Sequence, residues 1–326
     1  MMRFFRNFFS FCLAIALLAY ALKDISFVDI GRQFQQAHYG WIALVALLTV
    51  LTYLVRGKRW QQPLLVLGYA PTVFRTTVAM LAGVIASLIV PGSGELTRCA
   101  TLQRTDGVPF SQGIGSVVAE RVIDLIMLVA VLLLTLLVEF NRMHLYLAGL
   151  SPNLPNVSGW WLIAGSVAFV FLSWISWRWL LKSAIRKHPI ALKITNAVKG
   201  LWAGFSAIRS LPHPYLFVLL TALTYAFFWL NTYWLLLALD STRALPPSAA
   251  LTILAVSSLG GLAVPTQGGI GTYHFFVSRV LVLYGFTPTE GAVIATFLHA
   301  VGFGINLVLS SLSFAFIPFI LTNKSR

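Results

Sequence analysis

Five ionisable residues lie in parts of the sequence that are otherwise apolar and long enough to reach into a membrane. Glu95 and Arg98 follow one hydrophobic run closely, and Glu120, Arg121 and Asp124 lie inside the next one. Charge at membrane depth is costly and marks either a functional site or an internal salt bridge. Arginine forks bind phosphate well, and nearby carboxylates can neutralise them until an anion arrives. The residue types therefore indicate, with equal weight, a phosphate-binding site or an ion-pair network that clamps helices together.

Helical spacing favours contact among these side chains. Glu120 and Asp124 are four positions apart and share a helix face, whereas Arg121 and Asp124 are three apart and can pair. With a helix that begins near residue 114, Glu120 lies about 9 Å and Asp124 about 15 Å along the axis. We expect the acids, Glu95 included, to offset Arg98 and Arg121, because an unpaired arginine near the bilayer midplane is expensive.

A second set of candidates lies much later in the chain and carries less charge. Gly268, Gly269 and Gly271 are expected to form a tight turn whose backbone N–H groups can bind an anion. His274 and His299 would meet a phosphate if protonated, or would simply hydrogen-bond within a packed bundle. For a single histidine the second reading is the commoner one.

The elements that position these residues are predicted to be membrane helices. Hydrophobic residues make up 58% of the 326 residues, charged residues only 10%, and the mean hydropathy is +0.84. These values are typical of a polytopic all-α membrane protein, and the alternating pattern of barrel strands does not occur. The formal net charge of +14 falls in juxtamembrane loops, where it orients the chain and meets anionic lipid headgroups. Nucleic acid is therefore not expected as a partner.

Hydropathy predicts about six full spans, all in one integral membrane domain that covers residues 1–326. The first is read as a retained span, because no small-residue cleavage site follows it. Two shorter, broken hydrophobic segments are predicted near 77–110 and 248–286, and amphipathic interfacial helices near 28–39 and 190–208. The predicted full spans cover residues 5–22, 40–55, 114–138, 159–181, 214–239 and 291–319.

The two broken segments repeat one another. Val90-Pro91-Gly92-Ser93-Gly94 and Val264-Pro265-Thr266-Gln267-Gly268 each end a short apolar run, and each is followed by two glycines six positions apart. Broken hydrophobic segments at corresponding places in two halves are typical of transporters with a site near the bilayer midplane. The repeat halves would be about 40–138 and 214–319.

Loop charge predicts how these segments enter the membrane. The stretch between residues 181 and 214 is rich in Lys and Arg, lacks acids and should be cytoplasmic. It returns to the cytoplasm only if segment 77–110 enters and leaves on one side. Counting membrane crossings in the same way makes segment 248–286 a re-entrant hairpin from the opposite side. The repeat is then inverted, and both termini are cytoplasmic. The alternative is a pair of ordinary short helices joined by Pro-Gly loops.

Sequence motifs for catalysis are missing. The six histidines show no metal-ligand spacing, and no nucleophile elbow or P-loop occurs. Cys12 and Cys99 do not suggest a disulfide framework. We therefore expect no enzyme activity, no cofactor and no metal, and transport would be passive or driven by a gradient.

Four motifs, taken in order, resemble the lysylphosphatidylglycerol synthase transmembrane-region family, also described as flippase-like membrane proteins. The likeness extends over roughly residues 10–320. The motifs are Arg56-Gly57-Lys58-Arg59-Trp60, Val90-Pro91-Gly92-Ser93-Gly94-Glu95-Leu96-Thr97-Arg98, Val118-Ala119-Glu120-Arg121-Val122-Ile123-Asp124 and Val264-Pro265-Thr266-Gln267-Gly268-Gly269-Ile270-Gly271.

The resemblance implies a lipid translocase of the bacterial cytoplasmic (inner) membrane. Its substrate would be an anionic or aminoacylated phospholipid, such as lysyl-phosphatidylglycerol, or a polyprenyl-phosphate-linked lipid. The sequence departs from bifunctional members because no soluble transferase domain follows the last span, so synthase activity is not expected here. It also carries His299 where the resemblance leads us to expect a basic residue, often arginine.

Two other functional classes stay open. The chain could be a non-transporting accessory subunit that binds lipid beside a synthase or glycosyltransferase, with purely structural charges. An integral membrane enzyme acting on lipid phosphate is disfavoured by the missing motifs. A homodimer is compatible with the sequence, which does not specify the oligomeric state.

Overall fold

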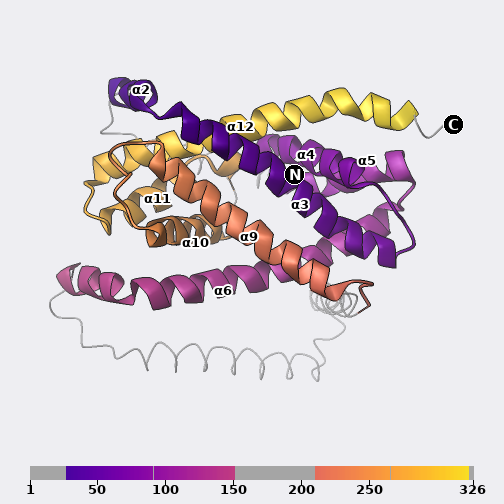
Figure 1. Ribbon diagram of the computed structural model, residues 1–326, viewed down its shortest axis with the longest axis horizontal. Coiled ribbons are helices and arrows are strands. Elements are labelled where there is room, and N and C mark those ends of the chain that lie inside the picture. The colour runs from indigo at the N-terminus through magenta and orange to yellow at the C-terminus, as the bar shows by residue number, and fades with distance from the viewer. Residues whose placement is uncertain (1–26, 91, 151–209, 265, 323–326) are drawn as a thin grey trace, which may run out of the picture.

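Every regular element in the described part of the chain is a helix (Figure 1). The computed structural model describes residues 27–90, 92–150, 210–264 and 266–322. The predicted spans 5–22 and 159–181 and the predicted interfacial helix 190–208 lie outside these residues. The described helices are α2 (Phe27–Gln36), α3 (Tyr39–Val66), α4 (Val73–Ile89), α5 (Ser93–Asp106), α6 (Phe110–Leu150), α9 (Pro214–Leu237), α10 (Pro247–Ala263), the 3₁₀ turn η2 (Gln267–Gly269), α11 (Thr272–Val282) and α12 (Pro288–Thr322).

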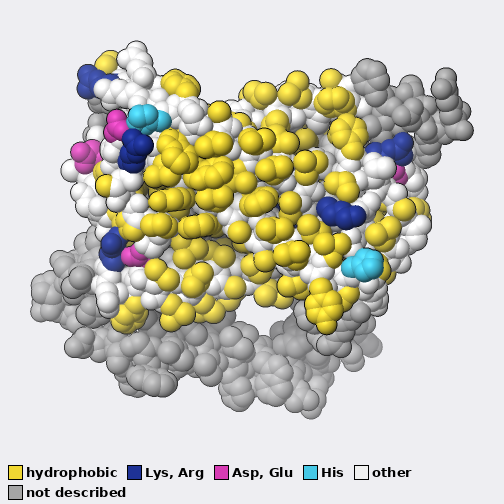
Figure 2. All heavy atoms as spheres, viewed as in Figure 1, with side chains coloured by type: hydrophobic (Ala, Val, Ile, Leu, Met, Phe, Trp, Pro, Cys, Tyr) yellow, Lys and Arg dark blue, Asp and Glu magenta, His cyan; other side chains and the backbone are white. Residues whose placement is uncertain are grey.

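Four of these helices are long and apolar enough to cross a bilayer. They contain the stretches Tyr39–Val66, Phe110–Arg142, Pro214–Leu237 and Pro288–Phe316. Hydrophobic side chains cover much of the visible face, and charged side chains lie mostly toward its two ends (Figure 2). An apolar surface of this extent suits a bilayer and not water. The prediction of an all-α integral membrane protein is therefore confirmed.

Helix α3 continues well beyond the predicted span of 40–55, so that prediction was too short. The helix runs to Val66 with Pro63 inside its last turn. The sequence suggested an end at the first basic residues, but Arg59 is only 1% exposed because a carboxylate from another helix neutralises it. Charges that are paired across helices do not end an apolar helix. The other described spans agree with prediction to within a few residues at their starts, and α6 extends to Leu150 instead of ending at 138.

Each half of the described chain contains a long helix, two shorter antiparallel segments and a second long helix. The shorter segments are α4 with α5 in the first half, and α10 with η2 and α11 in the second. Both α4 and α10 have 17 residues, and each is followed by a valine with φ of −130°, as expected for a residue before proline. The two broken segments predicted from the sequence are thus two helical hairpins.

The helices of one half contact those of the other in a reciprocal pattern. Helix α3 packs on α9, α4 packs on α12, and α6 packs on α10. Exchanging the halves leaves this set of contacts unchanged. The hairpin of α4 and α5 lies toward one end of the molecule, and the hairpin of α10 and α11 lies toward the other (Figure 1).

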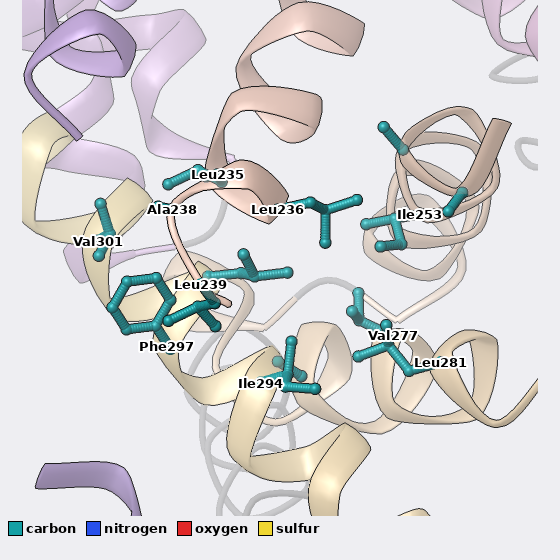
Figure 3. Packing of buried hydrophobic residues seen from close by; sticks show 14 of the residues in the cluster. Leu235, Leu236, Ala238, Leu239, Ile253, Val277, Leu281, Ile294, Phe297 and Val301 are labelled. Atoms are coloured by element: carbon teal, nitrogen blue, oxygen red, sulfur yellow. The ribbon is translucent and has the colours of Figure 1, made fainter. Parts of the chain in front are cut away.

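The largest apolar core joins the second half to the start of the first. Leu236, Ile253, Phe297 and Leu281 are almost fully buried and come from four different helices (Figure 3). At the margin of this core, the His38 ring lies 2.8 Å from the Asp240 carboxylate and ties the start of α3 to the turn after α9. This hydrogen bond lowers the pKa of the Asp240 carboxyl. A smaller core around Trp60, Leu64 and Leu102 lies on the other side of the molecule and supports the charged residues.

Candidate functional site

A buried carboxylate joins two buried arginines at the centre of the first half. Arg59 of α3 donates from Nη2 to Glu120 Oε1 at 2.7 Å, and Arg98 of α5 donates from Nη1 to Glu120 Oε2 at 2.7 Å. All three side chains are at most 3% exposed. Glu120 of α6 therefore holds three helices together through charge-assisted hydrogen bonds, which are the strongest that proteins make.

A second layer of charge lies on the more open side of this triad. Glu95 accepts from Arg121 and lies 3.0 Å from Arg98 Nε, while Asp124 accepts from Arg59 Nη2 at 2.9 Å. Arg121 also lies 3.4 Å from Asp124, as the spacing of three predicted. The expectation that the acids offset Arg98 and Arg121 is thus confirmed.

Each of the two buried arginines has N–H groups that make no hydrogen bond in the described part of the chain. Arg59 Nη1 and Arg98 Nη2 are buried and make no hydrogen bond within the described residues. Arg98 stacks on Trp60, with the guanidinium carbon 4.7 Å from the ring centroid, and Trp60 Nε1 donates to Ser116 at 3.0 Å. The stacking fixes the Arg98 plane without using an N–H group, so Nη2 keeps its hydrogen-bonding capacity.

A cavity of about 320 Å³ lies beside this charge network, where the tips of the two hairpins meet. This volume is at the lower end of the range of about 300–1,000 Å³ for small-molecule sites. It is large enough for a headgroup and too small for acyl chains. Its wall comes from α3, α4, α5, α6 and the second hairpin, and it includes Tyr53, Arg56, Gly83, Val84, Ser87, Gly92, Glu95, Arg98, Arg121, Thr266, Gly268 and Gly269.

Arg56 lies in this wall and was not among the candidates from the sequence. Its guanidinium carbon is 5.7 Å from the centre of the Tyr53 ring and 5.9 Å from that of Phe228. It forms no hydrogen bond or ion pair with any residue that the structure describes. The span predicted for residues 40–55 ends before Arg56 and Arg59, so neither was considered for the site. Their spacing of three within one apolar helix was the signal that would have placed them on a common face.

The glycine turn of the second hairpin contributes backbone and little charge to the cavity. Gly268 and Gly269 line it, with φ of +58° and +77° that favour glycine. The N–H of Gly269 donates to Thr266 O, and that of Gly271 donates to His274 Nδ1 at 3.3 Å. These two N–H groups therefore have partners inside the protein already. Of the three glycine N–H groups that were predicted to bind an anion, the N–H of Gly268 is therefore the best remaining candidate.

The two candidate histidines, His274 and His299, pack against this turn. The His299 ring nitrogen Nε2 lies 2.9 Å from Gly268 O, and the ring centroids of His274 and His299 are 4.7 Å apart. Neither side chain lines the cavity. Their contacts agree with hydrogen bonding inside a packed bundle. Among the side chains that the structure describes, no group of His, Cys, Asp and Glu is placed to hold a metal ion.

Comparison with known proteins agrees with the resemblance seen in the sequence. Residues 7–310 match the family described as lysylphosphatidylglycerol synthase TM region. Nothing among curated proteins or solved structures matches the chain. The matched range covers the charge network, the cavity and both hairpins.

Proposed function

The chain belongs to the lysylphosphatidylglycerol synthase TM region family, and on that premise we propose that it is a lipid translocase. It would move a lipid with a phosphate-bearing headgroup between the two leaflets of a bacterial inner membrane. The substrate would be a headgroup-modified phospholipid or a polyprenyl-phosphate-linked lipid. We assign it no enzyme activity.

One observation carries this proposal. A headgroup-sized cavity lies at the junction of the two hairpins. Arg56, Arg98 and Arg121 line it, and Glu95 is the one acid among the described residues of its wall. Intramembrane charge beside a cavity is the usual mark of a substrate pathway. The headgroup would occupy the cavity while its acyl chains stay in the bilayer, so that the phosphate crosses the apolar layer among cations.

We further propose that the two hairpins are re-entrant from opposite membrane faces and form an inverted repeat with halves of about 40–138 and 214–319. Helices α4 and α10 span only about 26 Å at 1.5 Å per residue, against a hydrocarbon core of about 30 Å. The reciprocal contacts between the halves and the opposite placement of the hairpins support this arrangement. Both termini would then be cytoplasmic.

Single cysteines at the hairpin bases test this topology. The four sites are Leu67 and Arg104 beside the first hairpin, and Ser241 and Thr289 beside the second; all four residues are exposed. With Cys12 and Cys99 replaced by alanine, we expect an impermeant maleimide to label the first pair from the cytoplasm and the second pair from outside. Labelling of Leu67 and Arg104 positions from opposite faces would rule out a re-entrant first hairpin.

Leaflet exchange in proteoliposomes tests the transport itself. The purified protein should expose labelled phospholipid of the inner leaflet to an external quencher, which protein-free vesicles do not. Val84→Trp fills the cavity and should abolish most exchange, because Val84 lines it. Ile85→Trp on the same helix is the matched control and should retain exchange, since Ile85 is not part of the wall. Equal exchange by both variants would show that lipid passes elsewhere.

A second function is favoured by one feature of the network. Glu120, Arg59 and Arg98 are so deeply buried and so closely ion-paired that they would also serve a rigid, non-transporting subunit that holds a lipid beside a synthase or glycosyltransferase. Exchange by the purified protein without a partner excludes that reading. Binding of lipid without exchange supports it.

A further inference from the structure

Among the described residues, the charged groups in and beside the cavity are one negative charge short. The ion-paired network is balanced, with three guanidinium groups (Arg59, Arg98 and Arg121) and three carboxylates (Glu95, Glu120 and Asp124), and Arg56 adds a fourth guanidinium group beside it. An excess of one positive charge next to a low-dielectric cavity attracts one negative charge strongly. A dianion would be tolerated better than a cation at this site, but only a monoanion neutralises the one excess positive charge.

The unbalanced cation is Arg56. Arg59, Arg98 and Arg121 each lie within hydrogen-bond or ion-pair distance of at least one carboxylate. Of the nine acidic residues in the sequence, seven have described side chains, and none of these seven comes within 4 Å of the Arg56 guanidinium. Glu120 and Asp124 act on Arg56 only from a longer distance.

The cavity also has a second donor for the same ligand. Arg98 lines the wall, is 3% exposed and has a buried Nη2 with no hydrogen-bond partner among the described residues. Buried donors that lack a partner are rare and call for a ligand or a water molecule. Arg56 and Arg98 come from α3 and α5, so an anion between them would join two helices of the first half.

We propose that the cavity recognises a phosphodiester monoanion whose group beyond the phosphate is uncharged, such as glycerol or a sugar, with Arg56 as its anchor. This inference rests on the proposed function and narrows its substrate class. Arginine matches phosphate through two parallel hydrogen bonds, and the rings of Tyr53 and Phe228 hold the Arg56 side chain at the wall.

The same geometry disfavours an aminoacylated headgroup. Glu95 is the carboxylate in the cavity wall, and both of its oxygens face arginines: Oε2 lies 3.0 Å from Arg98 Nε, and Oε1 accepts from Arg121. Within the described residues, no free carboxylate is available for the ammonium groups of a lysyl headgroup. Burying such a cation without a partner would be costly, so the cavity selects against it.

Binding to the full-length protein in detergent tests this proposal. Isothermal titration would use short-chain phosphatidylglycerol, its lysyl derivative and inorganic phosphate as probes. We expect phosphatidylglycerol to bind at least about tenfold tighter than either of the others, because one charged hydrogen-bonded pair is worth that factor or more. Arg56→Gln should weaken phosphatidylglycerol binding about tenfold to a hundredfold.

Two controls keep the result interpretable. Arg104→Gln removes the same charge from an exposed position outside the cavity and should bind like the wild type. Arg56→Gln should melt no lower than the wild type, because it breaks no ion pair among the described residues. Arg56→Lys keeps the charge without the fork and should bind with intermediate affinity.

The proposal fails if the lysyl lipid binds as tightly as phosphatidylglycerol or if Arg56→Gln binds normally. It also fails as a lipid site if inorganic phosphate binds as tightly as the lipid. Its failure is distinct from that of the translocase. Arg56-dependent binding without leaflet exchange contradicts transport alone, and leaflet exchange that is unaffected in Arg56→Gln contradicts this inference alone.

Discussion

The two hairpins share a backbone plan and differ in what they place at the cavity. In the first, Glu95 and Arg98 on α5 connect through Glu120 to Arg59. In the second, the corresponding tip is a run of glycines held by His299, with Tyr273 and Phe303 around that ring. One hairpin therefore supplies charge to the cavity, and the other supplies backbone that is packed against aromatic rings outside the cavity wall.

In the proposed translocase, this difference would separate headgroup binding from headgroup passage. A site that held the headgroup equally tightly from both sides would slow its release. Here the cations that can hold a phosphate come from the first half, whereas the second half contributes hydrogen-bonded turns that are largely neutral. A phosphate that leaves Arg56 toward the second hairpin would meet weaker partners, which favours onward movement.

The largest effect is expected from Glu120, the shared partner of two buried arginines. Glu120→Gln leaves Arg59 and Arg98 without their main counter-charge, and loss of one member of a buried pair typically costs about 3–5 kcal/mol. Unfolding in detergent should show a loss of this size. Glu290→Gln, at an exposed acid in the first turn of α12, should cost less than about 1 kcal/mol, because glutamine can accept the same hydrogen bond from Thr287. A similar, small loss for both variants would mean that the first half does not depend on its charges.

Much of this architecture could be predicted from the sequence because its signals are local. Hydropathy predicted the apolar helices, and the repeated Val-Pro near residues 90 and 264 located both hairpins. Spacing of three predicted the contact between Arg121 and Asp124. These features depend on helix geometry and on the restriction that proline places on the residue before it.

The omissions arise from contacts that no local pattern specifies. In the sequence alone, Arg59 resembles a loop residue. Its place inside a helix is explained only by its ion pair with Glu120, which lies 61 positions later. Arg56 lacks such a partner among the described residues, and only the packed structure reveals this. For His274 and His299 the sequence left two roles open, anion binding and hydrogen bonding within the bundle. Their contacts with backbone atoms and with each other agree with the second role.

A smaller effect distinguishes the two hairpin tips from each other. Gly92 and Gly268 both have positive φ, so alanine at either position should cost about 1–2 kcal/mol in backbone strain. A Cβ at Gly92 would meet nothing within 4 Å, whereas at Gly268 it would approach the Phe303 ring to 2.7 Å and Leu88 to 3.3 Å. We therefore expect Gly268→Ala to destabilise by about 1–3 kcal/mol more than Gly92→Ala, which is the usual range for overpacking.

Combining Gly268→Ala with Phe303→Leu sharpens this comparison, because the smaller side chain makes room for the new methyl group. In a double-mutant cycle measured by thermal unfolding, Phe303→Leu should recover about 1 kcal/mol in the Gly268→Ala background relative to its effect in the wild type. The same substitution beside Gly92→Ala should show no coupling, since nothing lies within 4 Å of the Cβ there. Additive effects at both tips would mean that the second hairpin is as loosely surrounded as the first, and that its close contact with Phe303 does not shape the cavity.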